Sequence, residues 1–330
     1  MQARAGGPVR PPLGIAFEGD LGQRIDAALA VAMLNGFVSK TQARSIAFAI
    51  SRSSLTTAQL ADVIVGFYYG RPVGGAATIG VPDGEAPSSD SSPLSATLSQ
   101  KNDEGAPRYT SNLRRLLDTP DNAVLIRNML LAQHDQNATI VVAGPATGLA
   151  RLLTLYGSRP QIAVKVRQLV VAMGAFPSGS PESSIKSDVI AARKVFADWP
   201  TPIVAVGAEV GEALPYPGAS IEKDFAWSAA HPVVDAYRAF KPMPYDAPAS
   251  ALAAMLQAVQ PEEGFFKLSD PGTISVQDDG RTQFTPGPEG RHRYLIVDPA
   301  QKERVTTAYT SMVSAQPAPR PGRGGRGATE

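Results

Sequence analysis

Residues 13–36 read LGIAFEGDLGQRIDAALAVAMLNG, and this stretch decides the predicted fold. A short apolar run opens it, a polar turn with Glu18, Asp20 and Asp26 follows, and residues 27–34 are apolar helix formers. The pattern predicts a buried strand, an acidic loop and a helix. In an open α/β sheet such a loop lies at the carboxyl end of a strand, where ligands bind. The carboxylates could hold a hard cation or act as a base there, or they could simply cap the helix.

Apolar runs recur after this first unit and alternate with helical segments at a spacing of roughly 30 residues, as in α/β proteins. The apolar runs predict strands over residues 45–50, 77–81, 138–143, 168–173, 202–206 and 294–297. The intervening segments predict helices over residues 57–68, 121–133, 145–156, 188–198, 231–240, 250–258 and 301–313. This order predicts a single large α/β domain with a mostly parallel, doubly wound sheet.

The last part of the chain and its two ends differ from this pattern. Residues 273–284 (TISVQDDGRTQF) place two alternating runs around Asp279-Gly280, which predicts a C-terminal β-hairpin extension of the same domain. Residues 1–12 and 315–330 are rich in Pro, Gly and Arg and lack periodicity. We therefore expect one domain over residues 13–314, with a disordered segment before it and a disordered tail after it.

Composition excludes several classes of function. The 330-residue chain carries 31 Lys and Arg against 30 Asp and Glu, a formal net charge of +1, so charge gives no reason to expect nucleic acid or an acidic membrane as partner. Without cysteines, disulfides, thiolate catalysis and cysteine-ligated zinc are excluded. No apolar run reaches the roughly 18 residues of a membrane span. We expect a soluble protein, either cytoplasmic or exported after signal removal.

Five stretches carry a family resemblance. They are FEGDLGQRIDAALA (17–30), FYYGRP (67–72), VVAGPATGLARLL (141–153), VVAMGAFPSG (170–179) with WPTPIV (199–204), and HPVVDAYRAF (231–240). In this order the chain resembles the inosine-uridine preferring nucleoside hydrolases, in particular a bacterial branch. The resemblance implies the nucleoside hydrolase fold, a homo-oligomer and hydrolysis of the N-glycosidic bond of ribonucleosides. In that family a calcium ion at the strand ends binds the ribose hydroxyls and the attacking water, and an aspartate takes the water's proton.

Matched residue by residue, the resemblance implies an incomplete metal site. Asp20 matches the base and metal ligand, and Asp26 matches the first aspartate of a pair, whereas Ala27 stands at the second. Ala251 falls at a further metal aspartate, and Asp246, five residues upstream, could substitute only if the loop were rebuilt. Calcium needs about six to eight oxygen ligands, several of them charged. We therefore expect no metal cofactor, and Ca²⁺ only if an altered site still works.

The sugar-binding positions are also altered. Glu182 matches the family's glutamate, but Ser184 replaces the asparagine that contacts ribose, and Gly148 stands where an asparagine is usual. Glu18 occupies the first acidic position of the first loop, where the family has aspartate. The resemblance thus implies Asp26, Glu182 and Ser184 as the substrate-binding residues.

The remaining candidates do not form a second site. His134, His231 and His292 are scattered and give no zinc pattern, and His231 precedes a proline where a helix-capping role is the better interpretation. Asp278-Asp279-Gly280 lacks the spaced oxygen ligands of a calcium loop and is predicted to be a turn. There is no Gly-x-Ser-x-Gly motif for a serine nucleophile.

Three hypotheses follow. The preferred one is a noncatalytic nucleoside hydrolase homologue that binds a ligand or a partner, because alanines stand at positions 27 and 251 and a serine at 184. The second is an active N-glycosidase with Asp20 as base in an altered centre. The third is a binding module that has kept a ribose-shaped cleft for a nucleoside or ribose.

Overall fold

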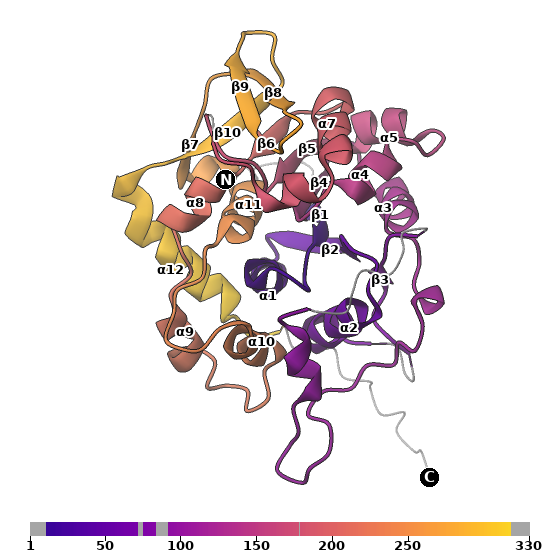
Figure 1. The fold of residues 1–330 in the computed structure, drawn as a ribbon, viewed down its shortest axis with the longest axis vertical. Helices are drawn as coiled ribbons and strands as arrows, with labels where there is room; N and C mark the ends of the chain where they lie inside the picture. The colour runs from indigo at the N-terminus through magenta and orange to yellow at the C-terminus, as the bar shows by residue number, and fades with distance from the viewer. Residues whose placement is uncertain (1–10, 72–74, 84–91, 178, 318–330) are drawn as a thin grey trace, which may run out of the picture.

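The computed structural model describes residues 11–71, 75–83, 92–177 and 179–317, and a ten-stranded sheet runs through its middle (Figure 1). The strands are β1 (Leu13–Gly19), β2 (Ala43–Ile50), β3 (Ile79–Gly80), β4 (Ala138–Ala143), β5 (Val166–Val171), β6 (Ile203–Ala205), β7 (Phe266–Leu268), β8 (Gly272–Val276), β9 (Thr282–Pro286) and β10 (His292–Val297). The helices are α1 (Ile25–Ser39), α2 (Leu55–Tyr69), α3 (Asn122–Leu131), α4 (Thr147–Leu152), α5 (Ser158–Lys165), α6 (Ser183–Ser187), α7 (Val189–Asp198), α8 (Ala208–Ala213), α9 (Gly218–Lys223), α10 (Pro232–Phe240), α11 (Ser250–Val259) and α12 (Lys302–Val313). Short 3₁₀ turns lie at Ser95–Ser99, Leu116–Asp118, Pro261–Glu263 and Pro299–Gln301.

The strand order confirms the predicted mostly parallel sheet. It runs β3-β2-β1-β4-β5-β6-β10-β8-β9, with β7 paired to β10 off this path. Neighbours from β3 to β10 pair in parallel, and β8 and β9 form the predicted antiparallel hairpin. Because β10 lies between β6 and β8, the C-terminal extension is part of the main sheet, and the chain forms a single α/β domain.

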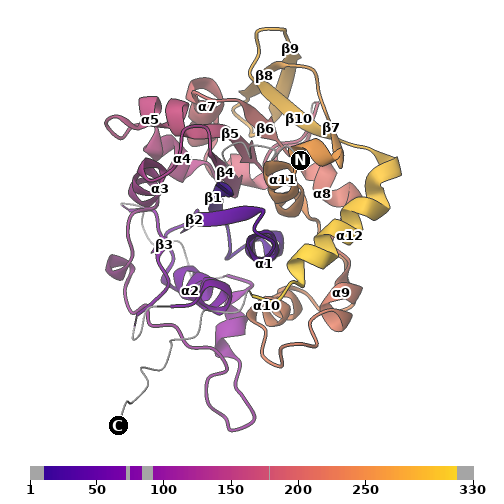
Figure 2. The same cartoon turned by 180° about the vertical axis from the view of Figure 1, so that it is seen from behind.

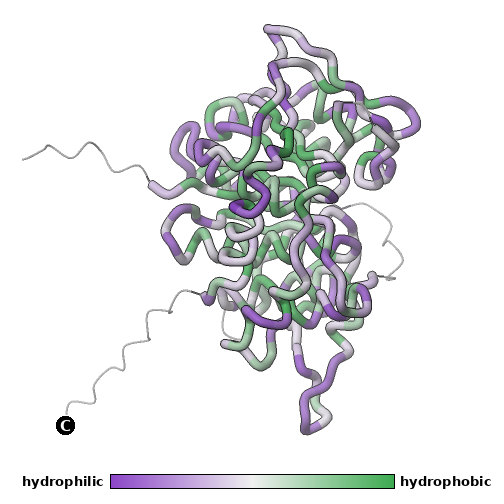
Figure 3. The backbone as a smooth tube through the Cα atoms, turned by 90° about the vertical axis from the view of Figure 1, so that its left-hand side faces the viewer, coloured by the Kyte–Doolittle hydropathy of each residue, from purple (hydrophilic) through white to green (hydrophobic). Residues whose placement is uncertain are grey.

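Side chains that alternate along each strand build a separate core on each face of the sheet. Ile15 and Phe17 of β1 join the core with α1, α2, α10, α11 and α12, whereas Ala16 joins the core with α3, α4, α5 and α7. Strand β4 divides in the same way, with Val141 facing the first core and Ile140 the second. Both faces are therefore apolar, as expected for a parallel sheet covered by helices. Figure 3 shows the hydrophobic segments concentrated inside and hydrophilic ones in the outer loops.

Helix α1 is apolar around its whole circumference, and residues 25–37 are all buried. A helix of this kind needs cover on every side. Helices α11 and α12 supply part of it, and both lie beside α1 in Figures 1 and 2. The contact with α12 requires Gly36, because a Cβ there would lie 2.3 Å from the carbonyl oxygen of Met312. Burial of α1 fixes its N-terminus, and with it Asp26, at the edge of the sheet.

Several short helices were not predicted. The helix expected over residues 145–156 ends early as α4, and α5 begins after Gly157, whose φ of +76° suits glycine. Helices α6, α8 and α9 fall outside the predicted helical ranges. The expected disordered segments, 1–12 and 315–330, fall largely outside the described residues, so the domain boundaries stay predictions. In the described ranges, no helix combines the length and apolarity needed to cross a bilayer.

Candidate functional site

The carboxyl ends of four parallel strands meet at one edge of the sheet. Register places Gly19 at the end of β1 beside Ile50 of β2 and Ala143 of β4. Asp20 follows directly after β1, and its backbone N–H donates to the Ala143 carbonyl. Ala172 directly follows β5 at the same edge. The acidic loop after β1 therefore lies where the sequence predicted it.

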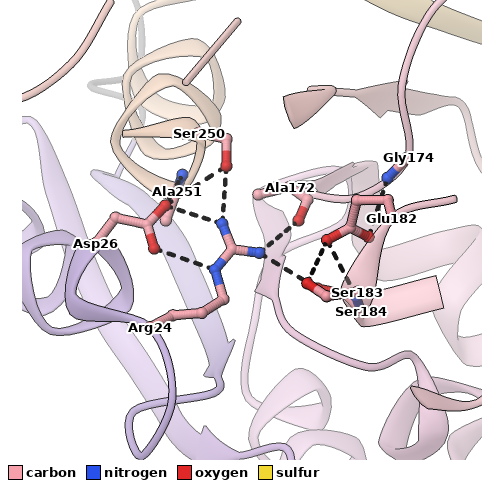
Figure 4. Close-up of polar contacts among 9 residues, drawn as sticks. All are labelled: Arg24, Asp26, Ala172, Gly174, Glu182, Ser183, Ser184, Ser250 and Ala251. Atoms are coloured by element: carbon pink, nitrogen blue, oxygen red, sulfur yellow. Dashed lines mark hydrogen bonds and ion pairs between the residues drawn. The ribbon is translucent and has the colours of Figure 1, made fainter. Parts of the chain in front are cut away.

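Arg24 makes the densest set of polar contacts at this edge (Figure 4). Its Nε and Nη2 donate to the two carboxylate oxygens of Asp26 at 3.0 and 2.8 Å. Nη2 also donates to Ser250 Oγ at 2.7 Å. Nη1 donates to the Ala172 carbonyl at 3.0 Å and to Ser184 Oγ at 3.3 Å. A guanidinium has five N–H donors, so these five bonds use all of them.

The Arg24–Asp26 pair is mostly removed from water. The exposed fraction of the side chain is 18% for Arg24 and 7% for Asp26. Burial alone lowers the pKa of Arg24, but the charge and hydrogen bonds of Asp26 outweigh burial, and the pKa lies above its ordinary value. Asp26 Oδ2 also accepts the backbone N–H of Ala251 at 2.9 Å, in the first turn of α11, where a negative charge is favourable.

A second arginine engages the other carboxylate of the first loop. Arg52 donates from Nε to Asp20 Oδ2 at 2.7 Å and from Nη2 to Ser187 Oγ at 2.9 Å. Asp20 Oδ1 and Ser51 Oγ are buried without a hydrogen-bond partner among the described residues. Each of the two retained aspartates is thus paired with an arginine, and each arginine also reaches a serine of α6.

Glu182 caps helix α6. Its Oε1 accepts the backbone N–H of Ser184 at 3.0 Å, and its Oε2 accepts the N–H of Ile185 at 3.2 Å and of Gly174 at 3.3 Å. Figure 4 shows this carboxylate beside the Arg24 contacts. The structure therefore brings together the three residues predicted to bind substrate, Asp26, Glu182 and Ser184, although their binding role stays a prediction.

The donor set at this edge does not fit a calcium ion. Ala27 and Ala251 are fully buried and offer no side-chain oxygen. Asp246 Oδ1 accepts the N–H of Gly218, the first residue of α9, at 2.8 Å, and this bond fixes the Asp246 carboxylate at the start of α9. In the part of the chain that the structure describes, no three His, Asp or Glu side chains come together as metal ligands. Asp20 and Asp26 each bond a guanidinium, which leaves too few charged oxygens for a cation that needs about six to eight ligands.

Glu18 and Gly148 form a compensated pair. Glu18 is fully buried, and its Oε1 accepts a hydrogen bond from Asn122 Nδ2 at 3.4 Å. A Cβ at position 148 would lie 2.5 and 2.6 Å from the two Glu18 carboxylate oxygens. The Glu18 carboxylate, together with Asn122 Nδ2 at 2.4 Å, therefore fills the space that a side chain at position 148 would need.

We expect Gly148→Ala to lower the free energy of unfolding by about 1–3 kcal/mol, because the added methyl overpacks a closed site. Glu18→Asp shortens the acid and should reduce that cost when the two substitutions are combined. Urea unfolding of the parent, both single variants and the double variant measures the coupling. Additive costs would show that the two positions do not share the space.

Sequence reasoning missed Arg24 and Arg52, although for Arg24 a cation inside an acidic loop was an available signal. It placed His231 correctly as a cap, since Nδ1 accepts the Val234 N–H at 3.4 Å at the start of α10. The expected turn at Asp279 is also confirmed, with the carboxylate bonded to Arg281.

A cavity of about 220 Å³ borders Arg24. Asp26, Glu182, Glu212 and Phe240 are among the residues that line it. Pockets for drug-sized ligands are usually about 300–1,000 Å³. This cavity is smaller than that range.

The comparisons with known proteins agree with this fold. A family model described as inosine-uridine preferring nucleoside hydrolase matches residues 25–310. A plant nucleoside hydrolase structure is 19% identical with a TM-score of 0.68, covering 92% of this chain and 100% of that one. A purine-preferring ribonucleoside hydrolase from Gardnerella vaginalis is 17% identical with a TM-score of 0.65, covering 91% and 98%. The type III effector XopQ, solved with adenosine diphosphate ribose, is 12% identical with a TM-score of 0.65, covering 92% and 95%. No curated protein matches the chain in sequence.

Proposed function

Because the chain belongs to the inosine-uridine preferring nucleoside hydrolase family, we propose that it is a nucleoside hydrolase-like binding protein whose N-ribohydrolase activity is lost or much reduced. One observation carries this proposal: both retained carboxylates of the first loop are bonded to arginines. Asp26 is bonded through both oxygens to Arg24, and Asp20 is bonded through one oxygen to Arg52. These carboxylates are therefore used for structure.

Glycoside hydrolysis requires an activated water and stabilisation of the developing charge on the sugar. A divalent ion can lower the pKa of a bound water, and a free carboxylate can take its proton. Here the alanines at positions 27 and 251 provide no charged oxygens for such an ion. The same edge of the sheet still presents polar groups and a small cavity, which supports binding without chemistry.

We propose a ribose-bearing small molecule as the ligand. The cavity beside Arg24 is small and is lined by polar groups, among them Glu212, whose carboxylate can accept hydrogen bonds from hydroxyls. XopQ, a structural neighbour, was solved with adenosine diphosphate ribose. A homo-oligomer is also proposed, on the resemblance alone, and gel filtration with light scattering would test it.

A specific observation favours a second candidate function, an active N-glycosidase centred on Asp20. Asp20 Oδ1 and Ser51 Oγ are buried and have no hydrogen-bond partner in the described ranges. A water placed between them could be polarised by the carboxylate. In this alternative, Asp26 would have to hold a metal ion, and its bond to Arg24 would have to open.

Base release separates the two functions. With inosine or uridine and millimolar Ca²⁺, we expect the purified chain to release no base above the Asp20→Asn variant, because Asp20 is not used as a base. Calorimetry with ribose and inosine should show saturable heat for both proteins. Calcium-dependent release that disappears in Asp20→Asn would establish the N-glycosidase instead. Absence of heat with millimolar ligand would reject the ribose-binding role.

A further inference from the structure

Oxygens from four separate parts of the chain converge on the Arg24 guanidinium. They are the Asp26 carboxylate at the start of α1, the Ala172 carbonyl after β5, Ser184 Oγ of α6 and Ser250 Oγ of α11. A carboxylate, a carbonyl and hydroxyls are the kinds of donor that surround a hard cation in proteins. The cation that they surround here belongs to the chain itself.

We propose that Arg24 is the resident cation of this cleft, joining the first loop to β5, α6 and α11 and keeping the cleft in shape without a divalent ion. The inference rests on the proposed function in one respect, that the cleft works without metal. Its test uses stability, so its failure can be distinguished from failure to bind ribose.

The geometry explains why an arginine suits this place. Asp26 is 5% exposed, and a buried carboxylate needs a paired charge. A guanidinium pairs with both carboxylate oxygens through two parallel bonds and still has three N–H groups that point elsewhere. Those three reach Ala172, Ser184 and Ser250, which are 148, 160 and 226 positions away in the sequence. Arg24 thus acts as a cross-link between distant segments.

Arg52 supplies a matched control. It also pairs with a buried aspartate and donates to a serine of α6. Its side chain is 34% exposed, against 18% for Arg24, and it makes hydrogen bonds to two side chains, Asp20 and Ser187. Removing Arg52 therefore opens a more solvated position that water can fill, whereas removing Arg24 leaves a closed set of oxygens without a cation.

Thermal unfolding with cation rescue tests the proposal. The parent should show the same Tm in EDTA and in millimolar Ca²⁺. Arg24→Ala should lower Tm by about 4–7 °C, a shift that corresponds to an unpaired buried charge in a chain of this size. Millimolar methylguanidinium, which fits the vacated volume, should restore part of that loss in a saturable way. Arg52→Ala should lose less, and methylguanidinium should not restore it.

Two results with the parent and Arg24→Ala would overturn the proposal, and a third applies to Arg24→Lys. One is a parent protein whose Tm rises with Ca²⁺ and falls with EDTA, because the cleft would then take a metal while Arg24 is present. The other is an Arg24→Ala variant that folds but shows no response to methylguanidinium. If Arg24→Ala does not fold, Arg24→Lys keeps a cation with only three donors, and an intermediate Tm is expected. A Tm for Arg24→Lys equal to that of the parent would reject the five-bond role.

Discussion

Replacing Arg24 with Met is expected to lower the free energy of unfolding by about 3–5 kcal/mol, the usual cost of removing one partner from a buried ion pair. Methionine retains much of the apolar stem and removes the charge. Asp26 would then keep its hydrogen bonds from α11 but lose the cation that neutralises it. Chemical denaturation at pH 7, with circular dichroism as the readout, measures the loss.

A double-mutant cycle identifies the cause. Asp26→Asn removes the carboxylate charge and keeps a side chain of the same shape. If the unpaired charge is responsible, the combined variant Arg24→Met with Asp26→Asn should be clearly more stable than the sum of the two single costs predicts. A cost for Arg24→Met below about 1 kcal/mol would mean that Asp26 is solvated when its partner is absent, and that the pair contributes like a surface ion pair.

Acidification from pH 7 to pH 4 is expected to remove several kcal/mol of stability through two buried histidines. Burial lowers the pKa of His231 to about 4. Burial, with the charge of Arg291 as a smaller cause, lowers the pKa of His292 to about 4. Both are neutral in the folded protein, whereas the unfolded chain takes up their protons near pH 6.5. Stability therefore falls from about pH 6.5 down to pH 4, by up to about 3 kcal/mol for each histidine.

The matched variant for this effect is His231→Asn. Asparagine is a good N-cap, so it can keep the bond to the Val234 N–H, and it does not titrate. The slope of unfolding free energy against pH measures the number of protons taken up on unfolding. Between pH 6 and pH 4.5 this number should be smaller for the variant than for the parent, by up to about one proton. Carboxylates titrate in the same range, but they contribute equally to both proteins. Parallel plots would show that His231 is protonated in the folded state.

The sequence was enough to predict the sheet and the edge where the site lies. Apolar runs such as ATIVVA at 138–143 are buried strands because helices cover both faces of the sheet. A continuous apolar run of this length is the sequence pattern of such a strand. The position of Asp20 after β1 followed from the same argument. The short helix α6 was missed because it has no apolar stripe to reveal it. Its N-terminus depends instead on the cap from Glu182.

The Arg24 contacts could not be predicted in the same way. Its partners at Ala172, Ser184 and Ser250 are brought near only by the finished sheet and by the packing of α11 on α1. The alanines at positions 27 and 251 indicated that charged oxygens were missing. They did not indicate that Arg24, two residues before Asp26, would turn inward and donate hydrogen bonds to the remaining carboxylate oxygens.

The close packing of α12 against α1 at Gly36 has a consequence for synthesis on the ribosome. Helix α1 is apolar on every side, yet α12, which covers part of it, is synthesised only after all the other helices of the described structure. A nascent chain therefore exposes part of the apolar surface of α1 until α12 has been made, and exposed apolar surface promotes aggregation. Chaperone capture of ribosome-bound intermediates should concentrate on residues 25–37 and cease once α12 has docked.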